Sequence, residues 1–87
     1  MKYYLIIARS ITYAQRMSRA LESRGIRAGM LRTPAEVMEQ GCGYALKIRA
    51  GDLAAALKAI KAAGLGPVRV FLYQQGSYRP VEGEGSL

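Results

Sequence analysis

A pattern that occurs twice along the chain limits its possible folds more than any other feature. It consists of an amphipathic helix, a glycine, an aliphatic residue and a strand, and it covers residues 12–31 and residues 52–74. Its glycine–aliphatic pairs are Gly25-Ile26 and Gly64-Leu65. A left-handed glycine followed by an apolar residue is typical of a helix end. Each copy therefore predicts a helix that stops at its glycine and a strand that follows.

Polar residues mark the starts of both helices, and apolar runs mark the strands. Thr12 can cap the first helix and Asp52 the second. The helices are predicted to end at Arg24 and Ala63, and four strands are predicted over residues 2–8, 27–31, 44–49 and 67–74. The first strand is apolar on both faces, which favours a central position in a sheet. Gly29 weakens the second strand, which favours an edge position.

The order strand–helix–strand, strand–helix–strand is that of the split βαβ, or ferredoxin-like, fold. We therefore expect an α/β protein of the α+β class with βαββαβ topology, in which a four-stranded antiparallel sheet carries two helices on one face. Right-handed crossovers place the first and third strands side by side in the centre. The 87 residues suit one domain. We assign it to residues 1–74 and interpret the glycine-rich residues 75–87 as a flexible C-terminal tail.

The sheet face opposite the helices is expected to be bare and of mixed character. Alternation along the third and fourth predicted strands places basic and aromatic side chains on it, namely Lys47, Arg49, Arg69, Phe71 and Tyr73. Such a face is a candidate contact surface. We expect the protein to self-associate through it, as a homodimer.

The chain is basic, with a net charge of +7 from thirteen Lys and Arg against six Asp and Glu. A charge of this sign attracts anions and acidic protein surfaces. The sequence has no histidine, one cysteine and scattered acidic residues. We therefore expect no metal site, no cofactor, and a carrier or binding protein rather than an enzyme. No apolar run is long enough to span a membrane, and a single cysteine favours a reducing, cytoplasmic location.

The single cysteine, Cys42, is the candidate functional residue, because a thiolate is the strongest nucleophile that the chain can supply. Gly41 and Gly43 flank it and leave the backbone unshielded. In the expected topology Cys42 lies near the end of the first strand, the start of the first helix and the end of the second strand. The residues expected to frame the thiol are Arg9, Ser10, Thr12 and Arg32. The alternative is that Cys42 is a small buried apolar residue, as free cysteines often are.

The segment before the cysteine carries a helix-start signal. Thr33 can act as a cap, Pro34 suits the first turn, and Glu36 follows three residues after the cap. This signal predicts one or two helical turns that end near Gln40.

Residues 34–48, with Gly41-Cys42-Gly43 at their centre, resemble the Se/S carrier protein-like family of bacteria. The resemblance extends over about residues 2–73. It implies that Cys42 carries sulfur or selenium as a persulfide or perselenide between a protein donor and a protein acceptor. Matching loop positions are occupied by Ser10, Thr12 and Pro34. A carrier of this kind requires an accessible, reactive thiol and no general base.

Two other functions are open at this point. A regulatory or assembly module would pair through the bare sheet face, with Cys42 merely packed. An RNA-binding module shares the fold class, and Gly43-Tyr44-Ala45 resembles part of the third-strand signature of the RNA recognition motif. That signature requires a second exposed aromatic residue of the same parity, where this chain has Leu46. We therefore do not expect nucleic acid to bind.

Overall fold

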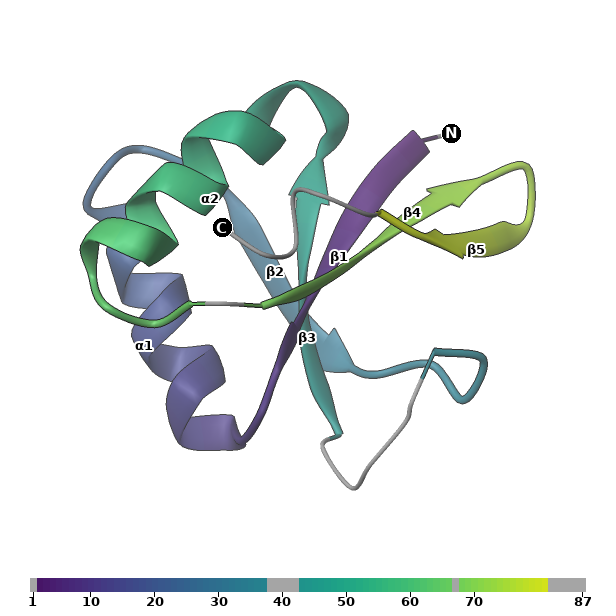
Figure 1. Ribbon diagram of the computed structural model, residues 1–87, viewed down its shortest axis with the longest axis horizontal. Helices are drawn as coiled ribbons and strands as arrows, with labels where there is room; N and C mark the ends of the chain where they lie inside the picture. Colours follow the sequence, from purple (N-terminus) through teal and green to yellow (C-terminus); the bar gives the residue numbers. More distant parts are fainter. Residues whose placement is uncertain (1, 38–42, 67, 82–87) are drawn as a thin grey trace.

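The computed structural model describes residues 2–37, 43–66 and 68–81 of the chain. Its elements in chain order are β1 (Lys2–Ala8), α1 (Ile11–Glu22), β2 (Ala28–Arg32), β3 (Tyr44–Arg49), the 3-10 turn η1 (Ala50–Asp52), α2 (Leu53–Ala62), β4 (Arg69–Gln74) and β5 (Ser77–Pro80). The strands form one antiparallel sheet in the order β2-β3-β1-β4-β5. Both helices lie on the same side of this sheet (Figure 1). The α+β class, the central pair β1–β3 and the edge position of β2 are confirmed.

The prediction of four strands is wrong, because the described residues form a fifth. β5 pairs with β4 in a hairpin whose register joins Gln74 to Ser77, so the turn consists of Gln75 and Gly76. Both turn residues have positive φ, 53° and 80°, which is the backbone that a tight antiparallel hairpin requires. Residues 77–80 of the expected tail thus belong to the sheet.

The helices end as the repeated pattern predicts. Gly25 and Gly64 have φ of +73° and +74°. The next residue in each case donates its amide back to the last turn: Ile26 to the Leu21 carbonyl at 2.9 Å, and Leu65 to the Ile60 carbonyl at 3.0 Å. These are the hydrogen bonds of a Schellman motif, so the two helix stops are confirmed.

The caps at the helix starts differ from the prediction. Ser10 caps α1, because its hydroxyl oxygen accepts a hydrogen bond from the Tyr13 amide at 3.2 Å. Thr12 lies inside the first turn of the helix and is exposed. Asp52 occupies the cap position of α2 but its side chain makes no capping hydrogen bond. Its carboxylate lies 3.6 Å from the Arg49 guanidinium instead.

The main core lies between the helices and the sheet. Each helix buries one apolar stripe, as the spacing of its apolar residues predicts. The buried residues are Ala14, Met17 and Leu21 from α1, Leu53, Ala56, Leu57, Ala59 and Ile60 from α2, Ile6, Ala8, Leu46, Ile48 and Val70 from the strands, and Ile26 from the segment before β2. This packing accounts for the parity of β1, β3 and β4, whose other side chains point to the opposite face.

That opposite face carries a second, smaller core. Val37, from the loop after β2, is 5% exposed and packs with Leu5, Ala45 and Phe71. The loop therefore covers part of the face that was expected to be bare. Its described part is a single hydrogen-bonded turn, in which the Val37 amide donates to the Pro34 carbonyl at 3.0 Å. The predicted helix is absent from residues 33–37, and residues 38–40 lie outside the described part.

Candidate functional site

Four elements meet at one end of the sheet: the end of β1, the end of β2, the start of β3 and the start of α1. Tyr44, the first residue of β3, is paired with Ala8 at the end of β1 and with Arg32 at the end of β2. α1 begins only three residues after Ala8. Figure 1 shows the end of β1, the start of α1, the start of β3 and the end of β2 at the same edge. The sequence analysis predicted these surroundings for Cys42, which lies outside the described residues together with Gly41. Gly43, the residue that follows Cys42, is described and lies at this end of the sheet.

Gly43 is held against the last residues of β2. Its carbonyl accepts a hydrogen bond from the Thr33 amide at 2.8 Å. A Cβ at position 43 would lie 3.3 Å from the Arg32 Nη1 atom, which is closer than ordinary van der Waals contact. Glycine thus lets a guanidinium lie directly against the backbone of the residue that follows Cys42.

Two tyrosine rings position the basic residues of this edge. The Arg32 guanidinium lies 5.7 Å from the centre of the Tyr44 ring. The Arg9 guanidinium lies 4.7 Å from the centre of the Tyr13 ring, one helical turn along α1. Cation–π contacts of this kind restrain exposed arginine side chains. Neither tyrosine was predicted to belong to the site, although the four-residue spacing of Arg9 and Tyr13 indicates that they can meet.

The start of α1 adds a partial positive charge to the same edge. The peptide dipoles of a twelve-residue helix sum to about half an elementary charge at its N-terminus. Ser10 belongs to this terminus as its cap. Thr12 is exposed in the first turn and does not cap the helix, so its predicted place in the frame of the thiol stays a prediction.

Thr33 was predicted to cap a helix, and this prediction is wrong for the described residues. It caps no helix in the described chain, yet it is 4% exposed. Its hydroxyl Oγ1 is buried and has no hydrogen-bond partner among the described residues. A buried hydroxyl without a partner costs free energy. Thr33 and Pro34 together bring the chain from β2 toward Val37.

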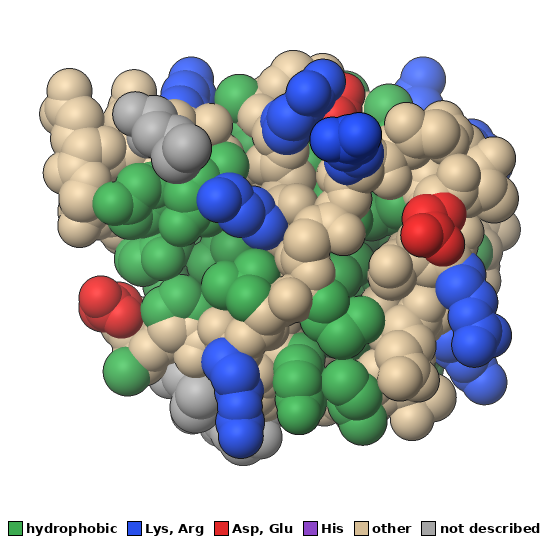
Figure 2. All heavy atoms as spheres, turned by 180° about the vertical axis from the view of Figure 1, so that it is seen from behind, with side chains coloured by type: hydrophobic (Ala, Val, Ile, Leu, Met, Phe, Trp, Pro, Cys, Tyr) green, Lys and Arg blue, Asp and Glu red, His purple; other side chains and the backbone are tan. Residues whose placement is uncertain are grey.

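The five residues predicted for a sheet-face interface have different surroundings. Lys47 Nζ lies 4.4 Å from the centre of the Tyr3 ring, and Tyr73 stacks on that ring at 4.7 Å. The Arg69 guanidinium lies 5.4 Å from the centre of the Phe71 ring. Phe71 itself is only 7% exposed, because the small core around Val37 buries it. Figure 2 shows, from behind, an apolar area bordered by Lys and Arg side chains.

One tyrosine of this face has a shifted pKa. The hydroxyl of Tyr78 lies 3.4 Å from that of Tyr3. This hydrogen bond, together with burial, raises the pKa of Tyr78 from 10.0 to about 12. The neutral phenol is favoured, because an ionised Tyr78 would be desolvated and close to other phenolic oxygens.

The described ranges contain no group of three or more Cys, Asp or Glu side chains that could hold a metal ion. Among the helices of those ranges, none is both long and apolar enough to cross a membrane.

Comparison with known proteins places this arrangement in a family. No curated protein matches the chain. Residues 3–71, which include all of the sheet edge described above, match the family described as "Putative Se/S carrier protein-like". The match runs from β1 into β4 and covers well over half of the 87 residues. The chain therefore belongs to the Se/S carrier protein-like family.

Proposed function

We propose that this protein carries sulfur or selenium on Cys42, as a persulfide or perselenide, between a protein donor and a protein acceptor. The observation that supports this most directly is the position of Gly43, the residue after Cys42. It lies beside the end of β1 and against the Arg32 guanidinium. Membership of the Se/S carrier protein-like family supports the same function.

The chemistry of loading requires only the thiol. The Cys42 thiolate attacks the terminal sulfur of a donor persulfide. The S–S bond of the donor breaks, the donor leaves as a thiolate, and a new S–S bond joins that sulfur to Cys42. The reaction involves no net oxidation. In the transfer step the acceptor thiolate attacks the outer sulfur of the Cys42 persulfide, and Cys42 leaves as the thiolate. Selenium follows the same scheme.

Positive charge at this edge supports the proposal electrostatically. Cations and helix N-termini near a cysteine favour the thiolate. Arg9, Arg32 and the start of α1 are the sources of positive charge that the structure brings to the end of β1 and β2. We propose that they favour the anionic thiolate and persulfide of Cys42.

Alkylation and sulfur loading of the folded protein test this function. We expect rapid alkylation of Cys42, half-maximal well below the pH of about 8.5 at which a free thiol ionises. A low-molecular-weight persulfide should add one sulfur atom to the wild type and none to Cys42→Ser, as measured by intact mass. Arg32→Gln should slow alkylation several-fold. The matched control is Arg24→Gln, an exposed arginine at the other end of α1.

A different outcome would favour an assembly module. If alkylation is slow until denaturant is added, or if Cys42→Ser gains the same sulfur as the wild type, the carrier function is refuted. Self-association through the open sheet face would then be the function to pursue, with scattering at increasing protein concentration as its test.

A further inference from the structure

The open sheet face contains a groove at the end opposite Gly43. Its volume is about 840 Å³, and its lining comes from β1, β2, β3, the end of α1 at Glu22 and the turn that follows it. The register places it at the far end of the strands, because Tyr3 pairs with Arg49 there while Ala8 pairs with Tyr44 at the Gly43 end. Sites for small molecules have volumes in this range.

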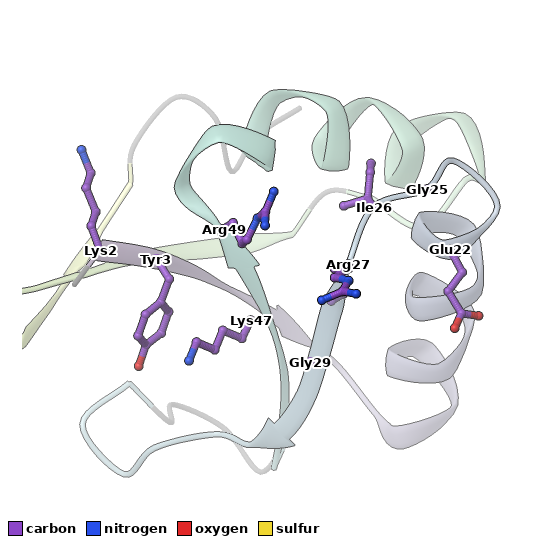
Figure 3. Close-up of a pocket in the computed structure, with 10 residues that line it drawn as sticks. Lys2, Tyr3, Glu22, Gly25, Ile26, Arg27, Gly29, Lys47 and Arg49 are labelled. Carbon is purple, nitrogen blue, oxygen red and sulfur yellow. The ribbon is translucent and has the colours of Figure 1, made fainter.

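The groove is rich in positive charge. Lys47 and Arg49 come from β3, and Arg27 directly precedes β2; Figure 3 shows all three on the same side as Gly29. Lys2 lines the groove too, but extends away from these three in that view. No ion pair joins Arg27 or Lys47 to a carboxylate of the described chain, whereas Arg49 is 3.6 Å from Asp52. The lining also includes one carboxylate, Glu22 at the end of α1, which makes no ion pair with these cations. Cations therefore outnumber carboxylates in the groove, which favours an anion as its ligand.

Gly29 leaves the floor of the groove open, and nothing in the fold requires a glycine at this position. It lies inside β2, where glycine weakens a strand. Its φ is not in the left-handed region, and a Cβ there would meet only the Lys47 Cβ at 4.0 Å, an ordinary contact. Neither backbone conformation nor internal packing excludes a larger residue. A glycine of this kind often marks a place where a ligand approaches the backbone.

The walls of the groove are largely apolar. Ile26 and Ala28 line it on the β2 side, and the Tyr3 ring lines it on the β1 side. One face of the Tyr3 ring stacks on Tyr73 from β4, and Lys47 from β3 lies over it at 4.4 Å. Since β3 and β4 flank β1 on opposite sides, Tyr73 and Lys47 cover the two faces of the ring and leave neither free for a nucleic-acid base. Binding of single-stranded nucleic acid depends on such faces.

From this geometry we propose that the groove binds a small organic phosphate, an anion with one or two phosphate groups on an apolar body. Arginine forks suit the bidentate recognition of phosphate, and Arg27, Lys47 and Arg49 provide the charge. The apolar body lies over Gly29, beside the Tyr3 ring. The proposal uses no residue of the Gly43 edge and is independent of the carrier function.

Titration with ADP, followed by NMR shifts and calorimetry at low salt, tests this proposal. We expect ADP to bind more tightly than either pyrophosphate or adenosine, which lack the apolar body and the charge respectively. Gly29→Val should fill the floor without changing charge, and Arg27→Gln/Lys47→Gln should remove charge without filling it. Each should weaken ADP binding by about ten-fold or more. The valine side chain occupies the space of the ligand, and the double substitution removes hydrogen bonds to charged groups, which are individually strong. Gly29→Ala replaces the valine variant if that does not fold.

The matched control is Lys58→Gln/Lys61→Gln, which removes the same charge from the exposed side of α2. It should change ADP affinity by less than about two-fold, because screened surface charges contribute little at a distance. Equal losses in this control and in Arg27→Gln/Lys47→Gln would overturn the proposal in favour of non-specific attraction. Absence of ADP binding, or unchanged binding in the Gly29 variants, would overturn it too. So would pyrophosphate that binds as tightly as ADP, or an oligouridylate that binds more tightly and shifts Tyr73 and Tyr78.

Discussion

The loop that leads toward Cys42 is anchored by one side chain, and shortening that side chain should have a measurable cost. Val37 is 5% exposed in the small core with Leu5, Ala45 and Phe71. Val37→Ala removes two methyl groups, worth about 0.8 kcal/mol each by transfer from water. A residual cavity raises the total to about 2 kcal/mol. Domains of this size are stable by roughly 4–13 kcal/mol, so this loss is substantial.

Urea denaturation followed by circular dichroism measures this loss directly. We expect a lower midpoint with an unchanged m-value, and a melting temperature lower by roughly 8–16 °C. The control is Glu36→Ala, because Glu36 is the exposed neighbour of Val37 in the same turn and should cost less than about 0.5 kcal/mol. If Val37→Ala costs no more than this control, the loop does not contribute packing energy to the sheet face and the reasoning fails.

Three further predictions concern the caps, the phenols and the buried hydroxyl. Ser10→Ala should lower the free energy of unfolding by about 1 kcal/mol through loss of the α1 cap, whereas Thr12→Ala should cost much less; urea titrations that show the reverse order would contradict the capping assignment. Tyr3→Phe should lower the pKa of Tyr78 from about 12 toward its ordinary value of 10.0, as measured by ultraviolet absorbance. Because the pKa of Tyr78 is raised in the folded state, the linked stabilisation is complete below pH 10 and is lost as the pH rises through about 12. If the pKa of Tyr78 were the same in Tyr3→Phe as in the wild type, the hydrogen bond between the two phenols would be excluded. Thr33→Val removes a buried hydroxyl that has no partner among the described residues, so it should be neutral or stabilising by up to about 1 kcal/mol; a clear loss of stability would show that this hydroxyl has a partner.

Some sequence predictions failed because the local signals had competitors. Ser10 and Thr12 are both residue types that cap helices well, and which of them caps α1 depends on the residue at which β1 ends. The Thr33–Glu36 signal is a helix start in isolation, but Val37 gains more by packing on Leu5 and Phe71 across the sheet. Burial on a distant surface therefore outweighs a local preference.

The strand β5 was missed for a different reason. A hairpin turn is recognised in a sequence by Asn-Gly or Asp-Gly, and here the turn is Gln75-Gly76. The short strand after it is polar and contains Pro80. β5 is held by backbone hydrogen bonds to β4, and the amino-acid composition of a segment does not predict such pairing.

The local regularities of this chain were determined by the sequence itself. The apolar stripes of α1 and α2, the glycine stops at Gly25 and Gly64 and the order of β1 to β4 depend on neighbours within a few residues, so periodicity and propensity suffice to predict them. Only the tertiary structure determined the contacts between distant segments. These are the cover that Val37 forms over the sheet, the approach of Arg32 to Gly43, and the basic groove around Gly29. Each of these contacts depends on strand register and on the free energy of packing between segments, and neither can be predicted from one segment alone.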